Sequence, residues 1–198
     1  HYPLRRQRQM CIRDSIMTVH TPADGGRVWN TQVALRRGEI IAQYRKLHLY
    51  DAFSMQESVN VVPGSDVPPL VPVAGMQVGM MTCYDLRFPE LARRLALDGA
   101  DVLVVPSAWV KGPLKEAHWA VLSTARALEN TCYVAAVGEC GPRNIGASMV
   151  VDPLGVVIAQ AGEQATLLFA DLDPDRIRHA REVLPVLKNR RFARPELA

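Results

Sequence analysis

Three short apolar segments, at residues 76–82, 101–106 and 132–137, limit the possible folds of this 198-residue chain most strongly. Nearly all their residues are apolar, and the segments are too short for buried helices. Each therefore predicts a strand that is covered on both faces. Because segments of helical length separate them, the sequence predicts an α/β fold.

Two helices are expected between these strands. Pro89 suits the first turn of a helix and Gly99 suits its end, which delimits the first helix. The second helix should run from near Pro113 to about Asn130. The apolar face that its spacing predicts consists of Leu114, Ala117, Val121, Leu122, Ala125 and Leu128.

Shorter strand patterns precede and follow this central region. Arg36-Arg37-Gly38 separates two of them and predicts a hairpin turn. A last helix should begin after Asp173, a good N-cap residue. Hairpins at both ends favour a mixed sheet over a purely parallel one. The strands expected outside the central region are residues 16–20, 28–35, 39–44, 148–151, 156–159 and 167–171.

The bulk composition is that of a globular domain, with 48% hydrophobic and 22% charged residues. No apolar run approaches the ~20 residues that span a bilayer, so no membrane partner is expected. The four cysteines include no closely spaced pair, which argues against a disulfide framework and a structural zinc site. A reduced, cytoplasmic protein without a metal is the expectation.

The net charge of +3 comes entirely from residues 1–15, where four arginines stand against one aspartate. Residues 16–198 are therefore neutral overall, and the charge gives no support for a nucleic-acid partner. The first fifteen residues show neither strand nor helix periodicity. We expect them to be a non-native or disordered leader, and residues 16–198 to form one domain.

Cys83 stands at the end of an apolar strand, directly before the turn into a helix. Ligands of α/β proteins bind beyond the carboxyl ends of strands, and helix N-termini favour thiolates and oxyanions. Cys83 could therefore be a nucleophile, although free cysteines are also common core residues. Lys46 could stabilise a thiolate or be a solvated strand-end lysine, and Glu57 could be an ordinary loop residue. Trp109 and Lys111 follow another strand end and are pocket candidates.

Several motifs together resemble the nitrilase superfamily of carbon–nitrogen hydrolases, closest to its bacterial deaminated glutathione amidase branch. The resemblance covers about residues 16–198. The motifs are YRKLHLYD, MTCYDLRFPEL, GPLKE followed by a tryptophan, CYVAA, and the C-terminal LPVL and NRRFA.

The resemblance implies a four-layer α-β-β-α sandwich and an amidase that works through a cysteine thioester, without a cofactor. Cys83 matches the nucleophile, Lys46 the catalytic lysine, and Glu57 a second, substrate-orienting glutamate. The backbone N–H of Tyr84 matches an oxyanion donor. The family's general-base glutamate lies upstream of the segment that resembles residues 16–20, where this chain has only a leader without glutamate. We therefore expect the fold to be incomplete at its N-terminus.

The implied substrate is a short amide with a carboxylate or 2-oxo acid end, such as deaminated glutathione or another ω-amide. Arg87, Lys111 or Arg143 could pair with its carboxylate. The resemblance also implies a homodimer. A second hypothesis is a catalytically impaired protein of this type that acts through binding or assembly, because the base is missing.

Overall fold

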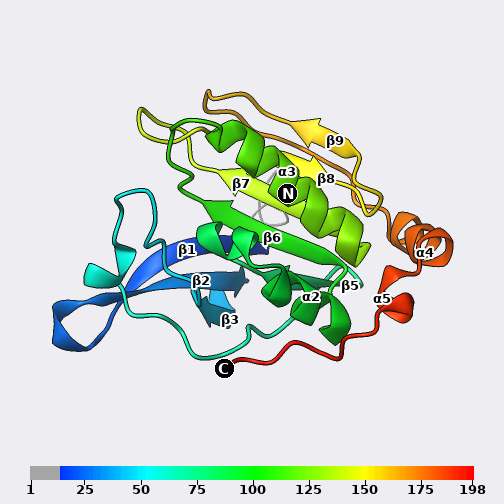
Figure 1. The fold of residues 1–198 in the computed structure, drawn as a ribbon, viewed down its shortest axis with the longest axis horizontal. Helices are drawn as coiled ribbons and strands as arrows, with labels where there is room; N and C mark the ends of the chain where they lie inside the picture. Colours follow the sequence, from blue (N-terminus) through cyan, green and yellow to red (C-terminus); the bar gives the residue numbers. More distant parts are fainter. Residues whose placement is uncertain (1–13) are drawn as a thin grey trace, which may run out of the picture.

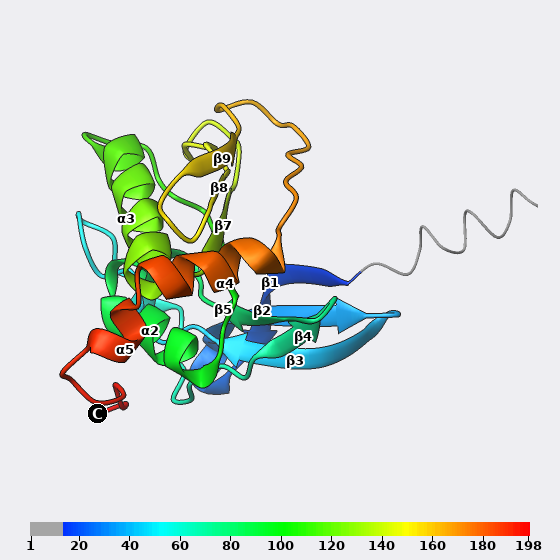
Figure 2. The same ribbon diagram turned by 90° about the vertical axis from the view of Figure 1, so that its right-hand side faces the viewer.

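Two β-sheets lie against each other in the structure, a computed structural model that describes residues 14–198 (Figures 1 and 2). The predicted leader falls outside the described residues except for Asp14 and Ser15. The smaller sheet has the order β1-β2-β3 and is antiparallel. Its strands are β1 (Ser15–Pro22), β2 (Val28–Arg36) and β3 (Glu39–Arg45).

The hairpin expected at residues 36–38 joins β2 to β3. Gly38 has a φ of +85°, which glycine adopts without steric cost and which lets the chain reverse over so few residues. A short 3-10 helix, η1 (Asp24–Gly26), makes the preceding connection between β1 and β2. The three predicted N-terminal strands are thus confirmed.

The larger sheet has the order β4-β5-β6-β7-β8-β9. Its central strands β5, β6 and β7 are parallel, as the apolar segments predict, and the outer pairings are antiparallel, so the sheet is mixed. The sequence patterns did not predict the edge strand β4. The strands are β4 (Val71–Val73), β5 (Met76–Met80), β6 (Val102–Ser107), β7 (Tyr133–Gly138), β8 (Met149–Val151) and β9 (Val157–Gln160).

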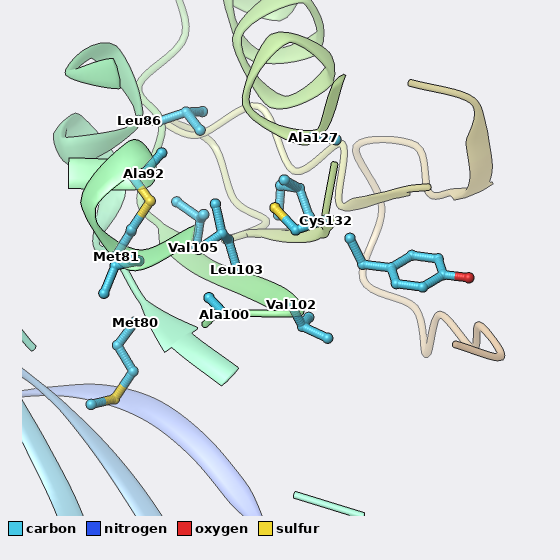
Figure 3. Close-up of a cluster of buried hydrophobic side chains, with 14 of the residues drawn as sticks. Met80, Met81, Leu86, Ala92, Ala100, Val102, Leu103, Val105, Ala127 and Cys132 are labelled. Carbon is cyan, nitrogen blue, oxygen red and sulfur yellow. The ribbon is translucent and has the colours of Figure 1, made fainter. Parts of the chain in front are cut away.

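Helices cover the face of the larger sheet that points away from the smaller sheet (Figure 2). These are α2 (Pro89–Asp98) and α3 (Lys115–Asn130), and α2 ends at Gly99 as predicted. The main core lies between them and the sheet, where Leu86, Leu103 and Val105 are fully buried (Figure 3). The remaining helices are η2 (Glu57–Val59), η3 (Cys83–Arg87), α4 (Pro174–Val183) and α5 (Val186–Asn189).

The predicted apolar face of α3 is wrong for most of its residues, although Leu122 packs against the core. Its buried side is partly polar, because Arg126 donates to the Leu86 carbonyl (3.0 Å) and Trp119 donates to the Ala147 carbonyl (2.8 Å). Those hydrogen bonds allow polar groups to be buried. The helix is turned so that Leu114, Val121 and Leu128 are exposed by 71%, 63% and 41%.

The strand predicted at residues 167–171 is also wrong. The segment passes from β9 to α4 without pairing with another strand. Leu167 and Phe169 alternate as strand residues do, but they are 83% and 80% exposed. Alternation alone does not make a strand where no neighbouring strand lies within reach.

The predicted α/β class is confirmed, and the described residues form three layers: the smaller sheet, the larger sheet and the α2–α3 helices. Within residues 14–198, no helix is both long enough and apolar enough to cross a membrane. Because β5 and β6 are parallel, their carboxyl ends meet at one edge of the larger sheet. The Cys83 turn follows that end of β5.

Candidate active site

Cys83 occupies a strained turn between β5 and α2. Its φ is +48°, a left-handed conformation that is unusual for a residue with a side chain. The residue begins η3, whose first N–H groups, including that of Tyr84, have no partner within the helix. The turn therefore brings a partly buried thiol next to backbone donors, as the strand-end position predicts.

Asp85 holds this turn in place. It is fully buried, and its carboxylate accepts hydrogen bonds from the Tyr44 hydroxyl (2.7 Å), the Thr82 N–H (2.8 Å) and the His48 N–H (3.1 Å). The His48 ring nitrogen Nδ1 lies 2.7 Å from the same carboxylate. Asp85 thus links the nucleophile turn to the lysine-bearing loop. This role of Asp85 was not predicted from the sequence, although Thr82 and Asp85 have the spacing of a capping box, which the structure forms.

Lys46 is 2% exposed and forms an ion pair with Glu57. Glu57 also accepts from the Tyr50 N–H (2.6 Å) and the Asn30 amide (3.3 Å), so its carboxylate is firmly oriented. The loop that separates the two residues in sequence turns back and brings their side chains together. A shared role of Lys46 and Glu57 at the site requires this contact.

Gly64 keeps that loop close to the lysine. Its N–H donates to the Lys46 carbonyl (2.8 Å). A Cβ atom at Gly64 would lie only 2.2 Å from the Arg45 carbonyl oxygen, so only glycine permits this approach. Gly64 is therefore required where the loop passes the strand end that carries Lys46.

The charges of these groups act on the Cys83 thiol. Burial is the largest influence and raises the pKa of Cys83 above its ordinary value. The Lys46 ammonium lowers this pKa, as does the neighbouring Ser107 hydroxyl, whereas the Glu57 and Asp85 carboxylates raise it. The net result is a thiol that is protonated at neutral pH and needs a base to become a nucleophile.

Of the other predicted binding residues, three pack against aromatic rings and the fourth, Lys111, faces a carboxylate on another loop. Arg87 and Trp109 lie together, with the guanidinium 4.9 Å from the ring centroid. Tyr84 packs edge-on against Tyr50 with ring centroids 5.0 Å apart. Lys111 instead lies 3.7 Å from Glu163 on another loop, and its ammonium is oriented toward that carboxylate.

One buried lysine near these aromatic residues was not predicted as a site residue, although it lies in the GPLKE motif. Lys115 is 6% exposed and donates to the Tyr50 hydroxyl (2.7 Å). A lysine in the first turn of a helix normally looks like a solvated charge, so the sequence carries no signal for its burial. Within residues 14–198, no group of three histidine, cysteine, aspartate or glutamate residues is placed to hold a metal ion.

The raised pKa of Cys83 predicts an unusual pH dependence of its alkylation by iodoacetamide. Because the thiolate is the reactive form, the rate should keep rising with pH beyond the range in which an ordinary thiol is already ionised. Lys46→Met should shift the profile to still higher pH, since the lysine lowers the pKa. Peptide mass spectrometry would follow Cys83 separately from the other cysteines. A rate that levels off below the pKa of a free thiol would contradict the prediction.

A search of family models matches residues 6–182 to the carbon–nitrogen hydrolase family. The chain belongs to this family. The match covers both motifs that carry Lys46 and Cys83, and the resemblance noted in the sequence is confirmed.

Two similar relatives come from Escherichia coli. The deaminated glutathione amidase of strain O157:H7 is 56% identical over 98% of this chain and 74% of its own length. The protein YbeM of strain K12 is 58% identical over 92% of this chain and 98% of its own length. The chain therefore spans about three quarters of the first relative and nearly all of the second.

A solved structure supports the fold and the importance of a cysteine in this family. A mutant of the amidase from Nesterenkonia sp. AN1 superimposes with a TM-score of 0.78 at 29% identity, over 94% of this chain and 68% of that one. It carries the acetamide moiety of fluoroacetamide, added covalently at the active site cysteine. A cysteine nucleophile is thus a trait of the family.

Proposed function

We propose that this carbon–nitrogen hydrolase cleaves the amide bond of a short, carboxylate-bearing amide through a thioester on Cys83. The observation that carries the proposal is the strained cysteine turn, on which the charges of Lys46 and Glu57 act together. The name of the O157:H7 relative points to deaminated glutathione, and another ω-amide of a 2-oxo acid fits equally well.

In the proposed reaction, the Cys83 sulfur attacks the amide carbon and the carbonyl oxygen becomes an oxyanion. The Lys46 ammonium and the Tyr84 N–H stabilise that charge. Collapse of the tetrahedral intermediate breaks the carbon–nitrogen bond, and the nitrogen leaves as ammonia after taking up the proton that the Cys83 thiol loses on attack. Water then hydrolyses the thioester to the carboxylic acid. Glu57 keeps Lys46 in position and orients the substrate amide.

The carboxylates nearest to the thiol are already engaged, which favours a second candidate function. Glu57 is paired with Lys46, and the Asp85 carboxylate accepts several hydrogen bonds. Neither is free to take the Cys83 proton. General-base catalysis typically contributes ~10²–10⁴-fold in rate. The alternative is therefore a catalytically impaired member of the family that acts through binding or assembly.

Ammonia release from glutaramate, the monoamide of glutaric acid, tests both candidates. We expect the purified chain to release ammonia roughly 10²–10⁴-fold more slowly than the O157:H7 relative, because in the described part of the chain the carboxylates beside the thiol are both engaged. A rate equal to that of the relative would contradict the impaired alternative. If no ammonia is released and no acyl group is found on the Cys83 peptide, the amidase proposal is wrong.

We also propose that the protein forms a homodimer through α3. Leu114, Val121 and Leu128 form an exposed apolar stripe with a seven-residue spacing, which suits packing against another helix. Val121→Lys should place a charge in this contact and shift the protein to a monomer in light scattering after gel filtration. Lys188→Glu, an exposed change on α5, is the matched control. A dimer that survives Val121→Lys would rule out this face.

A further inference from the structure

A group of cations and aromatic rings, which we call the cation cluster, lies beside the candidate catalytic residues. It consists of Lys115, Arg87, Tyr50, Phe53 and Trp109. The Lys115 ammonium lies 4.0 Å from the Phe53 ring centroid and 5.9 Å from that of Trp109. The Arg87 guanidinium lies 6.0 Å and 4.9 Å from the same two centroids. Two positive charges therefore share the same pair of rings.

Lys115 is buried, and within residues 14–198 its ammonium has no counter-ion. Its ammonium can donate three hydrogen bonds, and the Tyr50 hydroxyl accepts one of them. In the described part of the chain, no carboxylate lies within ion-pair distance of Lys115 or Arg87. Buried charges in proteins are normally paired, because removing them from water is costly. An unpaired buried ammonium therefore points to an anion that arrives from outside.

Arg87 has spare donor capacity at the same place. Its Nη2 atom lies 3.3 Å from the His118 ring, while its buried Nε has no hydrogen-bond partner within residues 14–198. A guanidinium and an ammonium together match the two oxygens of a carboxylate. Phe53, which lies over Lys115, is 64% exposed, so the covering ring sits at the surface.

Tyr50 connects the cation cluster to the catalytic groups. Its backbone N–H donates to Glu57, and its hydroxyl accepts from Lys115. Its ring packs against that of Tyr84, the residue after Cys83. Tyr50 thus contacts the unpaired ammonium with its hydroxyl and the Lys46–Glu57 ion pair with its backbone.

We propose that Lys115, assisted by Arg87, binds the carboxylate at the far end of the substrate and so determines specificity for ω-monoamides of short dicarboxylic acids. This inference rests on the proposed amidase function. It selects Lys115 and Arg87 over Lys111, whose ammonium already faces Glu163. The bound carboxylate would neutralise the buried charge while the amide carbon lies at Cys83.

The first test compares two amides of similar size. Glutaramate carries the carboxylate, and valeramide has a methyl group in its place. Lys115→Met should lower kcat/KM for glutaramate by about 10²-fold, mainly through KM, and lower kcat/KM for valeramide far less. Lys115→Arg should restore much of the preference, and the exposed Lys188→Met is the matched control. Equal losses on both amides, or no loss on glutaramate, would overturn the proposal.

A second test does not depend on turnover. Glutarate should protect Cys83 from iodoacetamide in the wild-type protein and in Lys188→Met, but not in Lys115→Met. If no amide is hydrolysed but glutarate protects only when Lys115 is present, the anion site stands and the amidase function fails. If the protein hydrolyses amides, but glutarate does not protect Cys83 from iodoacetamide and glutaramate is not preferred over valeramide, the proposed anion site is wrong. If Lys115→Met does not fold, Arg87→Met replaces it in both assays. Loss of the preference for glutaramate and of protection by glutarate would then support the anion site, and retention of both would overturn it.

Discussion

Replacing Cys83 with alanine should lower ammonia release from glutaramate by roughly 10⁴-fold or more, to the level of a blank. Alanine has no atom that can form the thioester, whereas Lys46 and the Tyr84 N–H would remain in place. Stability should change little, because alanine tolerates the left-handed turn about as poorly as cysteine does. Circular dichroism and thermal unfolding would confirm that the fold is retained.

The control for this experiment is Cys140→Ala, which removes a partly buried thiol from a loop outside the site. Its rate of ammonia release should match that of the unmodified protein. Mass spectrometry of the acylated protein gives an independent readout, since the acyl group should be found on the Cys83 peptide only. Turnover that persists in Cys83→Ala would show that another residue performs the chemistry.

Asp85→Ala should be the most destabilising single change at the site, by about 3 kcal/mol or more. The Tyr44 hydroxyl and the N–H groups of Thr82 and His48 would all lose their acceptor. Each buried donor left without a partner costs about 1–3 kcal/mol. Urea unfolding followed by tryptophan fluorescence would measure the difference in the free energy of unfolding.

Asp85→Asn is the matched variant, because asparagine keeps the shape and one carbonyl acceptor. Asp85→Asn should lower the free energy of unfolding less than Asp85→Ala does. It should still slow catalysis, because the asparagine NH₂ group would face hydrogen-bond donors. That repulsion should turn the Cys83 loop away from Lys46. If Asp85→Ala unfolds at the same urea concentration as the parent, the carboxylate does not hold this turn.

The central strands were predictable because each is a continuous apolar segment of strand length, and the structure places β5, β6 and β7 there. The buried face of α3 was not predictable from spacing. Arg126 looks like a surface residue, and its tertiary hydrogen bond to the Leu86 carbonyl makes its burial possible. The periodicity of apolar residues predicts where a helix lies but not which of its faces will pack against the rest of the protein.

For the candidate site, motifs identified Cys83, Lys46 and Glu57 through resemblance, since no sequence spacing brings these three positions together. Lys115 and Asp85 were missed because a charged residue is usually solvated, and their burial depends on partners far away in the sequence. Tyr44, for example, meets Asp85 across 41 positions. Contacts of this kind depend on how the two sheets pack.

The contact between the two sheets is polar near the site. Gln32 on β2 is fully buried, donates to the Val104 carbonyl on β6 (3.5 Å) and accepts from the Thr82 hydroxyl (3.1 Å). Hydrogen bonds of this kind form only when the strands of the two sheets meet in one alignment, whereas apolar surfaces alone would tolerate sliding. In refolding, secondary structure should therefore recover first, and the slow alkylation that distinguishes the buried Cys83 thiol from an ordinary thiol should return later, once the sheets have docked.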